Sequence, residues 1–144
     1  MSSKENEARA RSIQERNLLV EQLRASGHAD EAAKLRETYH AREMAGLAAD
    51  VYLSAAGEGK APVGWTRASE DPDALRRAGI ELTDAQIKEL LQPVGSGFRA
   101  EIYLPDAGVL GPEAKPVLAY KGSLGKILDP SQPNGYRESG PEDF

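Results

Sequence analysis

FRAEIYL, residues 98–104, alternates apolar and polar side chains over most of its length. This is the period of a β-strand with one covered face. PDAG, residues 105–108, is typical of a turn. PVLAY, residues 116–120, is a continuous apolar run of strand length and predicts a strand buried on both faces. The two runs together predict an antiparallel β pair.

The chain before this β pair has a different composition. All nine prolines and ten of the fourteen glycines lie after residue 60, whereas the first 60 residues are rich in Ala, Glu, Arg and Leu. We expect helices over about 3–26 and 30–54, with Gly27 ending the first, so that they form an antiparallel hairpin. The residues expected on the buried stripes are Ile13, Leu19, Val20 and Leu23 in the first helix and Met44, Leu47, Ala48, Val51 and Tyr52 in the second.

Two short helices are predicted between the hairpin and the β pair. One covers 72–78, with Pro72 near its start, and the other covers 84–92 behind the capping residue Thr83. The expected fold class is α+β. Its divisions are a helical hairpin over 1–56, an α/β portion over 57–125 and a loop or disordered tail over 126–144.

Charge and residue usage exclude several classes of protein. Eighteen basic against 23 acidic residues give a net charge of −5, which argues against a nucleic-acid partner. The chain has no cysteine, so disulfides, thiolate zinc sites and cysteine nucleophiles are excluded. The charged start MSSKENEARARSIQER is unlike a signal peptide and predicts a protein that is cytoplasmic at synthesis.

No complete catalytic motif is present. The sequence has no G-x-S-x-G elbow, no H-E-x-x-H helix and no phosphate-binding loop, and GSLGK at 122–126 has the wrong glycine spacing. His28 in a turn and His40 on a charged helix are expected to be solvated or capping residues. Glu70, Asp71 and Asp73 stand at the start of a predicted helix, where they interact favourably with the helix dipole.

Three segments in order carry a resemblance to a known family: LAADVY at 47–52, GWTR at 64–67, and GFRAEIY at 97–103 leading to VLAYKGS at 117–123. This order is similar to the amino-terminal part of class 3 lipases and of related bacterial phospholipase effectors, which are α/β-hydrolases. The resemblance implies that Gly122 and Ser123 form part of an oxyanion hole. It also implies that the two strands are the first of an α/β-hydrolase sheet, and that no cofactor is needed.

The serine, acid and histidine of such an enzyme come later in its chain. No histidine follows position 40, so the sequence resembles a hydrolase truncated before the nucleophile, and alone it should not hydrolyse esters. The expected function is that of the amino-terminal portion of a lipase or phospholipase acting on acyl esters of membrane lipids. Its expected partners are the lipid substrate, the remainder of the enzyme and an immunity or chaperone protein. Export would use a signal-peptide-independent secretion system.

A second reading has no catalytic role. The chain would then be a helical interaction module that docks a chaperone, an immunity protein or a secretion component. Under this reading, Gly122 and Ser123 form an ordinary turn. Tyr52, Phe98, Tyr103 and Tyr120 are then expected in the core, and Trp65 fills the space between hairpin and sheet.

Overall fold

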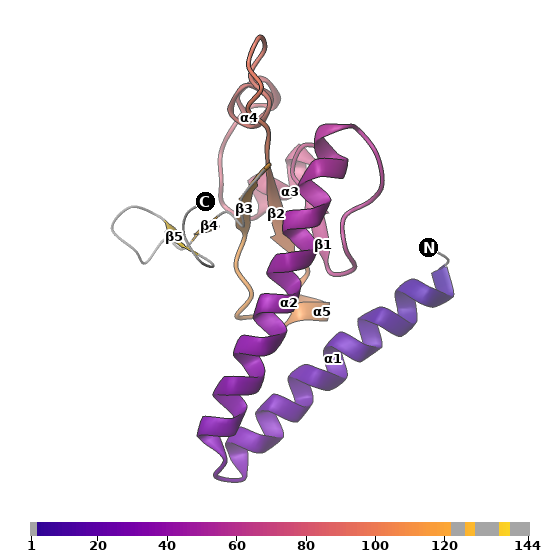
Figure 1. Cartoon of the computed structure of the whole chain (residues 1–144), viewed down its shortest axis with the longest axis vertical. Helices are drawn as coiled ribbons and strands as arrows, with labels where there is room; N and C mark the ends of the chain where they lie inside the picture. Colours follow the sequence, from indigo (N-terminus) through magenta and orange to yellow (C-terminus); the bar gives the residue numbers. More distant parts are fainter. Residues whose placement is uncertain (1–2, 122–125, 129–135, 139–144) are drawn as a thin grey trace.

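A computed structural model describes residues 3–121, 126–128 and 136–138. The fold is α+β, as the sequence predicts, and begins with a helical hairpin that leads into an antiparallel sheet (Figure 1). Within these described ranges, no helix combines the length and the apolar character needed to cross a membrane.

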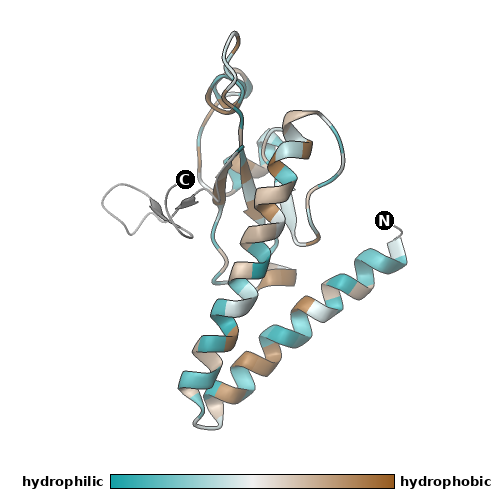
Figure 2. Ribbon diagram, in the orientation of Figure 1, coloured by the Kyte–Doolittle hydropathy of each residue, from teal (hydrophilic) through white to brown (hydrophobic). Residues whose placement is uncertain are grey.

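The hairpin consists of α1 (Ser3–Ala25) and α2 (Ala29–Ala55). Gly27 ends α1 with φ +88°, a conformation that a residue with a Cβ rarely adopts. The helices meet at this turn and diverge away from it (Figure 1). Hydrophilic residues dominate α2 near the turn, whereas apolar residues gather in the half that lies against the sheet (Figure 2). Leu19 and Tyr52, expected on the buried stripes, are exposed by 44% and 48%, which corrects the expectation for both.

Polar side chains of α1 hold the one-turn helix α5 (Ala107–Leu110), which replaces the predicted turn at 105–108. Gln14 Nε2 donates to the carbonyl oxygen of Gly108 at 2.7 Å, and Asn17 Nδ2 donates to that of Leu110 at 3.1 Å. The last carbonyl groups of a helix have no partner within it, so these amides satisfy groups that would otherwise be left open.

The sheet has five strands in the order β1-β2-β3-β4-β5, and all neighbours are antiparallel. Strands β2 (Ala100–Pro105) and β3 (Val117–Tyr120) form the predicted pair, with Tyr103 opposite Val117. The sequence misses β1 (Trp65–Arg67), because three residues are too few to show a period. Two further short strands, β4 (Lys126–Leu128) and β5 (Tyr136–Glu138), lie in the segment expected to be a loop or a disordered tail.

Strand β2 is buried on both faces, which corrects the expectation of one covered face. On the α2 side the core contains Met44, Leu47, Val51, Tyr103, Val117 and Ala119. On the other side, α3 (Pro72–Arg77) and α4 (Asp84–Leu91) cover the sheet, and the core contains Ala68, Leu75, Ile87, Leu91, Ala100, Ile102 and Leu104. The alternation seen in the sequence arises because Glu101, a polar residue, is itself buried.

The two short helices form where their capping residues predict. Asp71 accepts a hydrogen bond from the backbone N–H of Ala74 at the start of α3. Thr83 and Gln86 exchange side-chain to backbone hydrogen bonds at the start of α4, which is a capping box. These caps fix where the helices that cover the second face of the sheet begin.

Candidate functional site

The end of β3 is the place at which the sequence suggests chemistry. After Tyr120, the backbone N–H of Lys121 still donates to the carbonyl oxygen of Arg99 at 2.9 Å, so β2 and β3 stay paired to this point. Gly122 and Ser123 follow directly and lie outside the described residues, as does most of the 122–126 segment. The structure therefore describes the helix and strands that lead up to residue 122, namely α2 and β1 to β3.

A buried ion pair joins α2 to the sheet. Arg67 on β1 donates from Nε to Asp50 Oδ2 and from Nη2 to Asp50 Oδ1, both at 2.9 Å. The hydroxyl of Tyr103 on β2 donates to the same Oδ2 at 2.6 Å. All three residues are buried, so the pair is held together by two-point geometry in a site shielded from water.

Arg67 also satisfies its remaining donors. Its Nη1 lies 2.6 Å from Oε2 of Glu70 and 3.4 Å from the carbonyl oxygen of Gly59. Its Nη2 donates to the carbonyl oxygen of Glu58 at 2.9 Å. One guanidinium group therefore joins α2, the loop that follows it and β1.

A second buried carboxylate, Glu101 on β2, forms no ion pair with a described residue and is held by hydrogen bonds. Ser54 Oγ on α2 donates to its Oε1 at 2.7 Å, and the hydroxyl of Ser69 donates to the same oxygen. The backbone N–H groups of Ser69 and Ile102 donate to Oε2, each at 3.1 Å. Four donors replace the water that this charge would otherwise require.

Proton affinities in the network follow from this packing. Burial raises the pKa of the Tyr103 hydroxyl far above its usual value, and the hydrogen bond that this hydroxyl donates to Asp50 adds to the effect. The hydrogen bond to Asp50 raises the pKa of Arg67, against the opposing effect of burial. Tyr103 is therefore a neutral donor and Arg67 a permanent cation.

The network holds three segments of the chain together. Each oxygen of the buried Asp50 and Glu101 carboxylates accepts at least one hydrogen bond from a neighbouring group. Asp50 comes from 47–52, Arg67 from 64–67 and Tyr103 from 97–103, so the network links the three segments that carry the resemblance.

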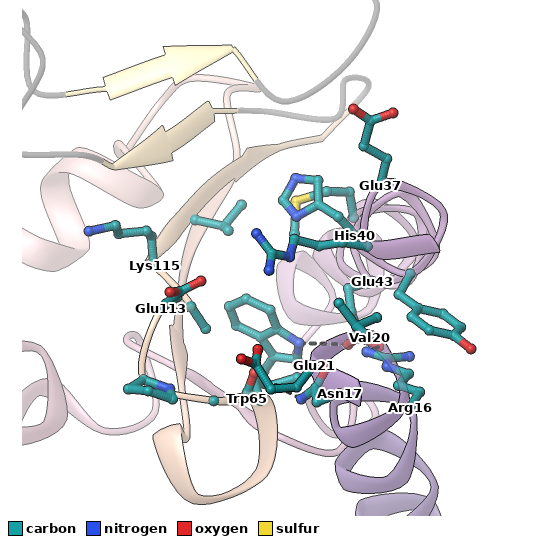
Figure 3. Close-up of a pocket in the computed structure, with 18 residues that line it drawn as sticks. Arg16, Asn17, Val20, Glu21, Glu37, His40, Glu43, Trp65, Glu113 and Lys115 are labelled. Atoms are coloured by element: carbon teal, nitrogen blue, oxygen red, sulfur yellow. Dashed lines mark hydrogen bonds and ion pairs between the residues drawn. The ribbon is translucent and has the colours of Figure 1, made fainter. Parts of the chain in front are cut away.

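A cleft of about 970 Å³ lies between the helical hairpin and the 110–117 segment (Figure 3). On its wall Glu43 accepts hydrogen bonds from Arg16 Nη2 at 2.7 Å and from the indole Nε1 of Trp65 at 2.9 Å. Trp65 packs against the α2 core, so it fills the space between hairpin and sheet as the sequence predicts. His40 also lines this cleft and is exposed.

Other candidates have structural roles. His28 is the residue before α2, and its Nδ1 lies 3.1 Å from the hydroxyl of Ser26. Asp71 caps α3, as a residue at a helix start is expected to do. Asp73 Oδ1 lies 2.5 Å from Arg76 Nη2, and Glu70 pairs with Arg67. In the part of the chain that the structure describes, no group of three acidic or histidine side chains is placed to hold a metal ion.

The aromatic residues expected in the core divide into two groups. Tyr103 is fully buried and Tyr120 half-buried. Tyr52 and Phe98 are exposed, which corrects the expectation for both. Tyr52 lies under the amino group of Lys121, and Phe98 precedes β2 and packs beside Tyr120.

The residues that sequence reasoning missed are the buried charges Asp50, Arg67 and Glu101. A signal exists for the first, because Leu47, Asp50 and Ser54 share the helical spacing of a buried face. A polar residue on such a face indicates a buried partner.

Comparison with known proteins identifies the family. Residues 43–138 match the Tle-like phospholipase domain, and this region includes the sheet and both of its covered faces. A search of curated proteins finds no match. The match covers most of the chain and contains the three linked segments, so the chain belongs to the Tle-like phospholipase domain family.

Proposed function

We propose that this chain is the amino-terminal portion of a phospholipase that hydrolyses acyl esters of membrane lipids, and that Gly122 and Ser123 form part of its oxyanion hole. The observation that carries the proposal is the position of these two residues directly after a paired strand in a phospholipase-related domain. Under this proposal the sheet is the beginning of an α/β-hydrolase sheet.

The chemistry requires few groups from this chain. A serine from elsewhere in the enzyme attacks the ester carbonyl, and the carbonyl oxygen becomes an oxyanion in the tetrahedral intermediate. A backbone N–H and the Ser123 hydroxyl donate hydrogen bonds to it, and Gly122 allows close approach because it has no Cβ. The intermediate then collapses: the lysolipid leaves with the proton that a base elsewhere in the enzyme took from the serine, and water hydrolyses the acyl-serine that remains to give the fatty acid.

The buried network supports this role mechanically. An oxyanion hole works only when its donors are already in place before charge develops. Asp50, Arg67 and Tyr103 fix β2 against α2, and β2 in turn pairs with β3 up to Lys121. The donors after β3 would therefore extend from a rigid part of the domain.

The test is Ser123→Ala in the complete enzyme. Loss of the hydroxyl should lower kcat by about 10²- to 10³-fold and leave KM nearly unchanged, since the charge exists only in the transition state. Ser12→Ala, at an exposed serine of α1, is the matched control and should retain wild-type kcat. A folded Ser123→Ala enzyme with normal kcat would remove Ser123 from the mechanism.

A second candidate function concerns the hairpin. Residues before Glu43, including all of α1, lie outside the family match, and α1 exposes Leu18 and Leu19. This part would dock an immunity protein, a chaperone or a secretion component. Deletion of α1 that abolishes partner capture and spares lipid hydrolysis would support this role, whereas capture without α1 would exclude it.

A further inference from the structure

One end of the molecule carries a cluster of exposed apolar side chains. The segment from α4 to β2 exposes Leu90 by 57%, Val94 by 96% and Phe98 by 43%. This segment forms the extremity of the long axis of the protein, beyond the end of α2 (Figure 1). Single exposed apolar residues are common, but three within nine residues at a protruding tip suggest a contact surface.

The loop at this tip is held in a defined shape. Gly95 has φ +78°, which lets the chain turn back after Pro93. The hydroxyl of Ser96 accepts a hydrogen bond from the backbone N–H of Phe98 at 3.0 Å. Arg99 Nη1 donates to the carbonyl oxygens of Ser96 and Phe98, at 2.9 and 2.6 Å. Val94 is therefore presented by a preformed loop.

Two cations lie side by side at the base of this tip. Ala100 pairs with Tyr120, so the preceding Arg99 stands opposite Lys121, and the backbone bond between them confirms the register. Like charges in this arrangement repel each other. Neither forms an ion pair with a described residue, and the Lys121 amino group lies 5.7 Å from the centre of the Tyr52 ring.

The local charge favours an anionic partner although the chain as a whole is acidic. Segments 90–99 and 117–123 contain one cation each and no carboxylate, and Lys88 and Glu89 offset each other on the neighbouring α4. Apolar side chains next to cations and tyrosines are the combination that suits a membrane interface, where the headgroup phosphates lie above the acyl chains. The arrangement therefore matches a phospholipid surface.

We propose that this end of the sheet docks on a phospholipid bilayer. Leu90, Val94 and Phe98 enter its apolar region, and Arg99 and Lys121 lie at the level of the phosphates. The inference rests on the proposed phospholipase function, because docking here brings the end of β3 to the lipid. It adds the surface through which the enzyme would reach its substrate.

The absence of cysteine allows a direct test. Val94→Cys in the full 144-residue chain is labelled with an environment-sensitive fluorophore and mixed with phosphatidylcholine vesicles. Leu18→Cys on α1, at an apolar residue that is 57% exposed and lies away from the tip, is the control. We expect a blue shift and a severalfold rise in emission at position 94 and no change at position 18. No change at 94, or an equal change at both positions, would overturn the proposal.

Charge and apolarity are tested separately by vesicle co-sedimentation. Val94→Asp should weaken binding about tenfold or more, since it removes an inserted apolar group, and its near-complete exposure means that folding is unaffected. Lys121→Gln should weaken binding to vesicles containing phosphatidylglycerol about fivefold, whereas the control Lys34→Gln on α2 should not. Equal binding by wild type and Val94→Asp contradicts the proposed insertion.

These measurements do not depend on turnover, so they separate two failures. If Ser123→Ala lowers kcat but vesicles do not change the emission of the label at position 94, the docking surface is wrong and the proposed function stands. If vesicles bind but Ser123→Ala is fully active, the oxyanion role is wrong. If the label responds to the remainder of the phospholipase in place of vesicles, the tip is an internal interface and the docking proposal fails.

Discussion

Arg67 and Asp50 form a two-point ion pair in the interior, and it joins residues 17 positions apart in sequence on different elements. The pair lies between the apolar core under α2 and the loop that follows α2. It therefore holds the helix to the edge of the sheet at a place where apolar packing alone gives no directional constraint.

Replacing Arg67 with Met should destabilise the domain strongly. The change leaves Asp50 buried with only the hydroxyl of Tyr103 as a partner, and breaking a buried pair from one side costs about 3–5 kcal/mol. Urea unfolding measures the loss. Arg77→Met, at an arginine that is largely exposed, is the control and should unfold at the wild-type midpoint. A similar midpoint for both variants would contradict a structural role for the pair.

A partner substitution sharpens this experiment. Asp50→Leu combined with Arg67→Met removes both charges, so no buried charge is left without its partner. The double variant should lose less free energy of unfolding than the two single variants lose in sum. Each single change leaves the other charge buried without its partner, and the double change does not. Additive losses would show that the two residues act independently.

Tyr103→Phe tests the raised pKa of the phenol. The hydroxyl is protonated in the folded state well above the pH at which an unfolded tyrosine ionises, about pH 10. Its contribution to stability is therefore complete below about pH 10 and falls as pH rises further, because only the unfolded state releases the proton. The free energy of unfolding of wild type should fall more steeply above about pH 10 than that of Tyr103→Phe. Equal slopes would indicate that Tyr103 has an ordinary pKa.

The two substitutions of Glu101 should differ from each other. Glu101→Ala leaves the hydroxyls of Ser54 and Ser69 and two backbone N–H groups without their acceptor, at a cost of about 1–3 kcal/mol for each buried group left unsatisfied. Glu101→Gln keeps one carbonyl oxygen, and the serine hydroxyls can rotate to accept from its amide. Thermal unfolding should therefore rank wild type above Gln and Gln above Ala. The opposite order would mean that the carboxylate is not held by these donors.

The elements of the fold could be predicted because their signals are local. Proline distribution, Gly27 and the Thr83 cap set the helices, and the runs 98–104 and 116–120 set the central β pair. The strands that the sequence missed are three residues long and depend on pairing with neighbours. These strands form because neighbouring strands pair with them, and their own residues carry no sufficient signal.

The buried charges could not be predicted for the same reason. Arg67 and Glu101 resemble solvated residues in the sequence, and only the approach of α2 to β1 and β2 removes them from water. The three segments that carry the resemblance lie within the matched residues 43–138, and the resemblance rests mainly on their glycines and aromatic residues. Asp50, Arg67 and Tyr103 are the residues that join these segments in space.

A second buried arginine provides a contrast with Arg67. Arg16 is 9% exposed and donates from Nη2 to Glu43, while its Nε and Nη1 have no hydrogen-bond partner among the described residues. Its guanidinium lies 5.0 Å from the centre of the Tyr39 ring. The favourable pairing is therefore offset by the burial of two donors for which the described residues provide no acceptor.

Arg16→Met should consequently cost less than about 1 kcal/mol, far below Arg67→Met. Methionine keeps the apolar contact with Tyr39, and Glu43 keeps the indole N–H of Trp65 and Arg9 as partners. Trp65 is the only tryptophan, so its emission reports whether the cleft wall stays intact while urea unfolding gives the stability. A loss as large as that of Arg67→Met, with Trp65 emission unchanged, would mean that the free donors of Arg16 are satisfied in solution.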